Sequence, residues 1–106
     1  MTIRIASEFS RVPAGRMRTD GPFSGERFRD DFLIPALKRG DQVRIVFDGA
    51  RGYGSSFLEE AFGGLVRQGL FPVNDLERRL EFISEDDPSI ALEVKGYIKN
   101  EAVRSS

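Results

Sequence analysis

Two adjacent serines, Ser55 and Ser56, have the position in this chain that best suits chemistry. They follow a turn with three glycines at residues 48–54 and precede an amphipathic segment, so we expect their hydroxyl groups at the beginning of a helix. A phosphate attached there would be stabilised by the positive end of the helix dipole and by nearby free amides. The spacing from Ser56 to Glu59 equally fits a capping box, in which the serine only closes the helix. Both interpretations stay open from the residues alone.

An anion site is a second hypothesis. Arg16, Arg18 and Arg51 would form an anion-binding rim if the segments that carry them lie at the same end of the sheet. The segment Gly52-Tyr53-Gly54 gives little support to a nucleotide site, because it lacks the lysine of a P-loop and the spacing of a dinucleotide fingerprint. We therefore expect Tyr53 to pack or to line a surface.

Carboxylate chemistry is the remaining catalytic possibility. The pairs Asp30-Asp31 and Glu59-Glu60 are adjacent, and neighbouring residues on a helix point in different directions. We interpret both pairs as solvated helix faces. Because a hydrolase built on carboxylates needs two of them in one pocket, the sequence predicts that the protein is not an enzyme.

The composition excludes several classes of function. The 106 residues contain no cysteine and no histidine, which removes thiol chemistry, the commonest general base and the usual zinc ligands. Sixteen basic and seventeen acidic residues give a net charge of -1, so no global field recruits nucleic acid. No signal peptide or membrane-spanning run is recognisable. We expect a cytoplasmic protein with no cofactor, no metal, no nucleic-acid partner and no membrane association.

The clearest elements surround the two serines. Alternating apolar residues predict a strand at residues 42–48, apolar on both faces and therefore near the centre of a sheet. Apolar spacing predicts the following helix at residues 56–68, with Gly69 as its stop. The pair Gly63-Gly64 costs helix stability, and close approach to the sheet is the simplest reason for it.

The N-terminal third is expected to contain a hairpin and a helix. Residues 2–10 suit a strand, residues 12–15 a turn, and residues 16–19 a returning strand with Met17 facing inward. Ser24 is the predicted N-cap of a helix that ends before Gly40. Pro35 should kink that helix or cause it to start again.

The C-terminal third continues the alternation of helix and strand. It has a short helical segment at residues 74–79, a strand at residues 80–83, a last helix after Asp87-Pro88, and expected fraying at residues 103–106. The complete prediction is a single α/β domain over residues 1–106, with a small mixed sheet of about four strands and helices mainly on one face.

The segments Gly15–Arg29 and Asp48–Val66, the latter with its Gly-Tyr-Gly-Ser-Ser-Phe run, resemble the bacterial STAS-like domain family of unknown function, number 4325. That family is similar to the STAS domains of anti-sigma factor antagonists, in which a strand, a serine-bearing turn and the next helix form the docking surface. A GHKL-type kinase, which is also the anti-sigma factor, phosphorylates the serine there. By position, Ser56 matches the phosphorylated serine and Ser55 the residue before it.

The resemblance implies a signalling switch that docks a GHKL-type ATPase or kinase through the second helix and the turn before it. The alternative is a small-molecule or nucleotide sensor that binds an anion at the same helix start. The residues expected to contact a protein partner are Arg51, Tyr53, Gly54, Phe57, Glu59 and Glu60.

Overall fold

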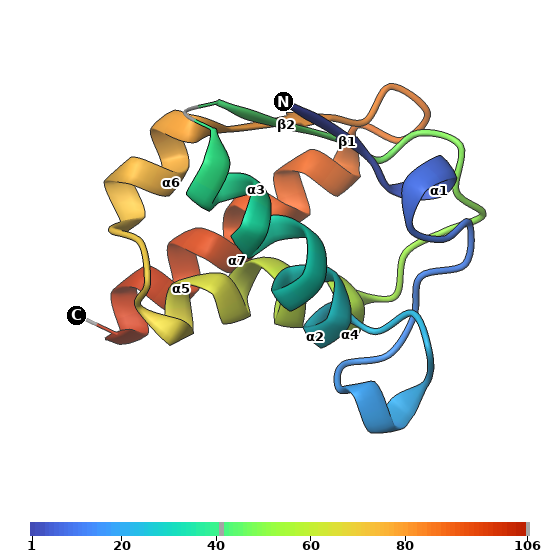
Figure 1. Ribbon diagram of the computed structural model, residues 1–106, viewed down its shortest axis with the longest axis horizontal. Helices are drawn as coiled ribbons and strands as arrows, with labels where there is room; N and C mark the ends of the chain where they lie inside the picture. Colours follow the sequence, from blue (N-terminus) through green and yellow to red (C-terminus); the bar gives the residue numbers. More distant parts are fainter. Residues whose placement is uncertain (41, 106) are drawn as a thin grey trace.

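Three parallel strands form the sheet in the computed structural model, which describes residues 1–40 and 42–105 (Figure 1). They are β1 (Thr2–Arg4), β2 (Val43–Val46) and β3 (Leu80–Ile83), in the order β1-β2-β3. Ile3, Ile45 and Phe82 lie side by side in the register. The central position predicted for the second strand is therefore confirmed.

Two helical units of the same plan lie beneath the sheet. The first helical unit is α2 (Gly25–Phe28), the π-helical segment η2 (Arg29–Leu33) and α3 (Ile34–Arg39). The second helical unit is α4 (Ser55–Leu58), the π-helical segment η3 (Glu59–Gly63) and α5 (Gly64–Gln68). The remaining helices are α1 (Ile5–Glu8), the short 3-10 turn η1 (Arg18–Asp20), α6 (Val73–Arg79) and α7 (Ser89–Ser105).

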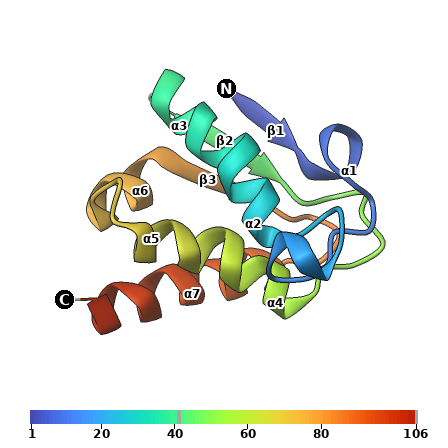
Figure 2. The ribbon, with the colours of Figure 1, turned by 60° about the horizontal axis from the view of Figure 1, so that its bottom comes forward.

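The core lies between the sheet and this helical layer. Apolar residues of one sheet face, including Val43 and Ile45, are fully buried against the helices. The rings of Phe62 and Phe82 meet edge to face with centroids 5.5 Å apart, which joins the second helical unit to β3. Figure 1 shows the helices on one side of the sheet, as the sequence predicts. Figure 2 shows α2 beside α4 and the loop around η1 next to them.

The predicted N-terminal hairpin is wrong. β1 ends at Arg4, and the chain turns into α1 instead of continuing as a strand to residue 10. The residues expected to return as a strand form a tight turn, in which the Asp20 carboxylate accepts the N–H groups of Arg16 (3.2 Å) and Met17 (2.8 Å). Because side-chain acceptors occupy these amides, the segment does not join the sheet, and the Met17 side chain is exposed.

The described sheet consequently has three strands and is entirely parallel, where about four mixed strands are predicted. Parallel neighbours need a crossover between them. The first helical unit supplies it from β1 to β2, and the second helical unit with α6 supplies it from β2 to β3.

Helix boundaries agree with the sequence at several special residues. Ser24 caps the first helical unit by accepting the N–H of Arg27 at 3.2 Å. Gly40 ends that unit, and Gly69 ends the second one in the left-handed conformation with φ of 70°. Pro35 is the second residue of α3 and follows Ile34, which donates its N–H to the carbonyl of Arg29 at the end of η2. The wide π turn and a renewed α-helix thus accommodate the proline.

The C-terminal helix is longer than expected. Asp87 accepts the N–H of Ser89 at 3.1 Å and begins α7, as predicted from Asp87-Pro88. The helix runs to Ser105, so the predicted fraying is wrong for residues 103–105. Ser106 lies outside the described residues. Val94 and Ile98 bury its inner stripe.

Candidate functional site

The second helical unit begins without a side-chain cap. Gly54 is the N-cap residue, and the carbonyl of Gly54 accepts the N–H of Leu58 at 3.1 Å. Ser55 and Ser56 therefore lie inside the first turn, so the predicted capping box at Ser56 is wrong. Both serines are exposed, and neither hydroxyl has a hydrogen-bond partner among the described residues.

The turn before these serines is fixed at its base. Gly49, with φ of 92°, donates its N–H to Asp86 at 3.0 Å, and Asp86 donates its own N–H to Asp48 at 2.8 Å. The turn is thereby tied to the loop between β3 and α7. Because glycine alone tolerates this φ readily, the contact depends on Gly49.

Tyr53 anchors the other end of the turn. Its hydroxyl donates to the carbonyl of Phe47 at 2.7 Å, and its ring packs edge to face on the Phe47 ring with centroids 5.4 Å apart. Burial, together with the charge of Asp48, raises the pKa of Tyr53 above its ordinary value. Tyr53 is consequently a neutral hydrogen-bond donor that holds the turn against the end of β2.

Only part of the predicted partner surface is accessible. Arg51 and Gly54 are exposed beside the two serines, and Tyr53 and Glu59 are half-buried. Phe57 has no exposed surface, and Glu60 is 8% exposed. Phe57 instead packs against the first helical unit, where its carbonyl oxygen lies so close to Gly25 that a Cβ there would overlap it.

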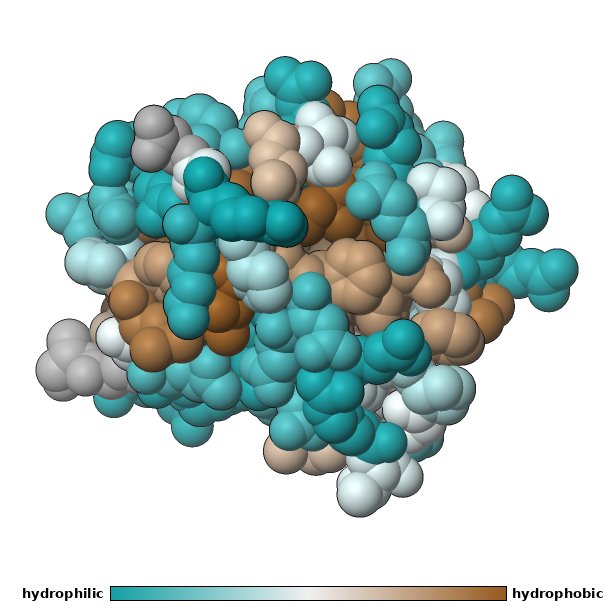
Figure 3. Space-filling view, in the orientation of Figure 1, coloured by the Kyte–Doolittle hydropathy of each residue, from teal (hydrophilic) through white to brown (hydrophobic). Residues whose placement is uncertain are grey.

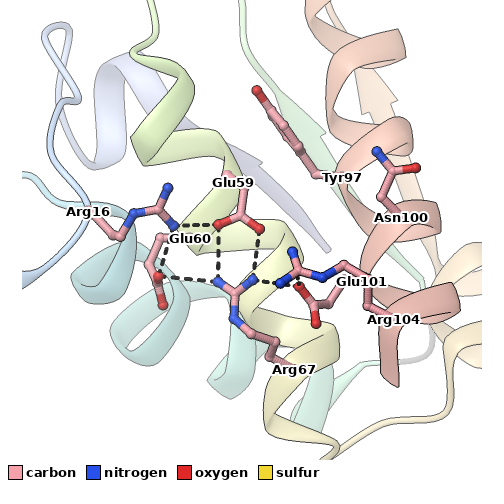
Figure 4. A pocket seen from close by; sticks show the side chains of 8 residues that line it. All are labelled: Arg16, Glu59, Glu60, Arg67, Tyr97, Asn100, Glu101 and Arg104. Atoms are coloured by element: carbon pink, nitrogen blue, oxygen red, sulfur yellow. Dashed lines mark hydrogen bonds and ion pairs between the residues drawn. The ribbon is translucent and has the colours of Figure 1, made fainter. Parts of the chain in front are cut away.

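The pair Glu59-Glu60 belongs to a cluster of paired charges rather than to solvated helix faces (Figure 4). Arg67 donates to Glu59 at 2.8 Å, to Glu60 at 3.2 Å and to Glu101 at 2.6 Å. Arg16 bonds to Glu59 and, at 3.3 Å, to Glu60. We call this group the ionic cluster; with Arg29 it comprises Arg16, Arg29, Glu59, Glu60, Arg67 and Glu101.

Arg29 is the buried member on the first helical unit. Its side chain is 5% exposed, and it donates to Glu60 at 2.5 Å, which joins the two π-helical segments. A π turn has more residues than an α turn, so consecutive side chains diverge less in direction. This explains why Glu59 and Glu60 converge on the same arginines, against the expectation for an α-helix.

Gly63 and Gly64 make room for the ionic cluster. A Cβ at Gly63 would lie 2.5 Å from a carboxylate oxygen of Glu59. A Cβ at Gly64 would lie 2.6 Å from the Arg29 guanidinium and 2.9 Å from the Glu60 carboxylate. The glycine pair is thus explained by contact with charged side chains, and the predicted close approach to the sheet is wrong.

The electrostatics of the cluster do not suit general acid chemistry. Hydrogen bonds from Arg67, and to a smaller extent Arg16, lower the pKa of Glu59 to about 2 against the opposing effect of burial. The carboxylate is therefore ionised and neutralised by arginines at neutral pH. The sequence carried no signal for this arrangement, because Arg29 and Glu60 are far apart in the chain and a π turn has no recognisable motif.

Two of the three arginines predicted to form the anion-binding rim are already paired with carboxylates. Arg16 lies in the ionic cluster, and Arg18 donates to Asp31 at 3.0 Å. Arg51 is exposed, and its N–H bonds to the carbonyl of Arg11 at 2.8 Å, so the turn and the N-terminal loop do lie at the same end. An open hollow of about 650 Å³ adjoins the cluster and is lined by the residues labelled in Figure 4.

Neither a metal centre nor a membrane span is found in the described part of the chain. Residues 1–40 and 42–105 contain no group of three or more acidic side chains arranged to hold a metal ion. Within the same ranges, no helix has the length and hydropathy needed to cross a membrane. The surface in Figure 3 is largely hydrophilic, with smaller apolar patches.

The comparison with protein families gives one match. The model of the STAS-like domain of unknown function (DUF4325) matches residues 24–89, which include both helical units, β2 and β3. No curated protein and no solved structure matches the chain.

Proposed function

The chain belongs to the family of STAS-like domains of unknown function, DUF4325, and from this premise we propose that it is a non-enzymatic protein-interaction switch. The docking surface is the exposed part of the turn before α4 together with the first turn of that helix. Arg51, Gly54, Ser55 and Ser56 supply its accessible residues. Ser56 is the regulated position, with Ser55 as the second candidate.

The observation that carries the proposal is that both serines are exposed and make no hydrogen bond that the fold needs. Since Gly54 already caps the helix, a structural explanation for two hydroxyls at this point is lacking. A phosphate on either serine would stand at the positive end of a helical unit that runs on to Gln68. It would also change the charge of the surface that Arg51 shares.

The partner is a GHKL-type ATPase or kinase, as the resemblance to anti-sigma factor antagonists implies. The test is incubation with ATP and a GHKL-type ATPase encoded beside the gene, followed by intact-protein mass measurement. We expect one added phosphate, which is lost in the double variant Ser55→Ala/Ser56→Ala and retained in Ser7→Ala, an exposed serine on α1. No phosphate and no complex with a demonstrably active ATPase would overturn the proposal.

A second candidate function is anion sensing, and the open hollow beside the ionic cluster favours it. Arg16, Arg67 and Arg104 border that hollow. A ligand there has to compete with Glu59, Glu60 and Glu101 for the same arginines, so we expect only weak binding of simple anions. A rise in melting temperature with phosphate or a nucleotide, abolished by Arg16→Glu, would support sensing in place of switching.

A further inference from the structure

The sheet has one covered face and one bare face. Figure 1 shows the helices on one side of the strands, with no helix over the other. All-parallel sheets are found almost only with both faces covered, because the helical crossovers that connect parallel strands lie on the faces of the sheet. The described sheet is entirely parallel, so its second face lacks the cover that such sheets normally have.

The residues of the bare face form two rows across the strands. One row is Thr2, Arg44 and Glu81, and the next is Arg4, Val46 and Ile83, as the strand register sets them side by side. Val46 and Ile83 are half-buried and are not part of the apolar core. An apolar pair thus lies beside a charged pair on an open surface.

The charged pair is self-complementary. Arg44 donates to Glu81 at 2.6 Å across the two strands, and both side chains are about half exposed. A two-fold axis parallel to the strands, between β2 and β3, would place β2 of one copy opposite β3 of the other. Arg44 would then face Glu81 of the second copy, and Val46 would face its Ile83. No like charges would meet in these two rows.

We propose that this bare sheet face is the interface of a symmetric homodimer in which two copies pack sheet on sheet. The two sheets would stand about 10 Å apart, the usual spacing of face-to-face packing. The two copies of Arg44 and Glu81 would form a square of four charges that alternate in sign. Beside this square, the two contacts between Val46 and Ile83 would be buried from solvent. The small number of apolar residues predicts a weak dimer, with a dissociation constant on the order of micromolar.

The dimer interface is separate from the docking surface of the proposed switch. In Figure 1, α4 lies at the bottom of the molecule and the strands lie along its top. Dimerisation through the sheet therefore leaves Ser55 and Ser56 accessible in both copies. The inference does not depend on phosphorylation of either serine.

Charge reversal tests the interface by sedimentation equilibrium over a range of protein concentrations. Glu81→Arg sets four arginines together in the dimer, and Arg44→Glu sets four carboxylates together, so each variant should dimerise at least about tenfold more weakly. An equimolar mixture of the two variants should recover the affinity of the wild-type protein, because every arginine then faces a carboxylate. Recovery on mixing separates an interface effect from damage to either monomer.

Lys99→Glu on α7 is the control: this exposed residue borders a hollow with Leu80 and Phe82 on the helix-covered side of β3, not on the bare face, and its charge reversal should leave the dimer unchanged. Circular dichroism of each variant establishes that it is folded. Three results would overturn the proposal: a wild-type protein that is monomeric at all concentrations, a dimer insensitive to Glu81→Arg, or two variants that stay monomeric when mixed.

Discussion

The two helical units share one plan, but the serines at their N-termini have different roles. Each begins beside a serine, passes through a five-residue π-helical segment and ends at a glycine. Ser24 is fully buried and accepts a backbone N–H, whereas Ser55 and Ser56 are exposed beyond a glycine cap and make no such bond. The same residue type at the same kind of position is structural in one unit and available for modification in the other.

The contact between the units should show the largest effect. Arg29→Ala removes the buried partner of Glu60 from the junction of the two π-helical segments. We expect a loss of about 3 kcal/mol in the free energy of unfolding, the lower end of the range found when one member of a buried ion pair is removed, because Glu60 keeps Arg16 and Arg67 as partners. Urea denaturation measures it.

Arg18→Ala is the matched control, because Arg18 pairs with Asp31 on the surface, where solvent screens the pair, and its removal should destabilise the fold far less than removal of Arg29. Equal losses in the two variants would contradict a structural role for the buried pair.

Disruption of the close packing between the two helical units should give the second-largest loss of stability. Gly25→Ala adds a Cβ that overlaps the carbonyl oxygen of Phe57 and lies 3.0 Å from the amide nitrogen of Ala61. Because these are backbone atoms, the helices must separate, and we expect a loss of about 2–3 kcal/mol.

Gly96→Ala provides the opposite case on α7, where a Cβ meets no atom within 4 Å. The greater helix propensity of alanine should raise stability by roughly 0.5–1 kcal/mol there. Thermal melting of both variants should therefore shift in opposite directions, and shifts of the same sign would argue against the helix contact at Gly25.

The N-cap of the first helical unit should give the third-largest effect on stability. Ser24→Ala leaves the N–H of Arg27 without its acceptor in a buried position, and loss of such a cap typically costs about 1–2 kcal/mol. Ser24→Thr keeps a neutral hydroxyl acceptor at the same place. Chemical denaturation should rank the threonine variant above the alanine variant, and an alanine variant as stable as the wild-type protein would refute the cap.

Acid should weaken the second unit through Glu59. Its pKa is lowered from 4.5 to about 2 by Arg67 first and Arg16 next, so the folded state holds the ionised form more strongly than the unfolded state does. The stabilisation is present above pH 4.5 and is lost as the pH falls toward about 2. We expect a smaller loss than for Ser24→Ala, since Arg16 and Arg67 are partly exposed and screened by solvent.

The measurement is thermal melting as a function of pH. In Glu59→Gln this part of the acid dependence should disappear, because the amide has no proton to gain in that range. A variant with the same pH profile as the wild-type protein would exclude Glu59 as the cause.

Substitution of the two serines at the N-terminus of the second helical unit should change stability least. Ser55→Ala and Ser56→Ala remove exposed hydroxyls without hydrogen-bond partners among the described residues, so stability should change by less than about 0.5 kcal/mol. Set beside Ser24→Ala in the same denaturation assay, this result sharpens the contrast between the N-termini of the two helical units. A loss as large as that for Ser24 would restore the capping interpretation of Ser56.

Local patterns in the sequence were sufficient for much of the fold. Alternation identified β2, and special residues such as Ser24, Gly40 and Gly69 identified helix ends, because each of these signals acts within one turn or one strand. The same local reasoning misplaced the N-cap of α4 by two residues, at Ser56 instead of Gly54, and with it the role of Ser56. Gly54 and Ser56 are both acceptable caps, and only the tertiary structure decides between them.

The ionic cluster could not be predicted from the sequence, because its partners come from distant segments. Arg16 and Glu59 lie 43 positions apart, and Arg29 and Glu60 lie 31 apart. The convergence of Glu59 and Glu60 also depends on a π turn, which follows from packing between the helical units rather than from residue propensity. The hairpin error has a similar origin, since Asp20 takes the amides that a strand would have used.

The two glycines beside the ionic cluster restrict which sequences other members of the family can have. At Gly64, a Cβ would overlap the guanidinium of Arg29 and the carboxylate of Glu60, so a larger residue there has to displace the ends of these two side chains from their buried pair. Position 64 should therefore co-vary with positions 29 and 60 among relatives, and position 63 with position 59. A substitution transplanted alone from a relative would be damaging here, although it is harmless in its own background.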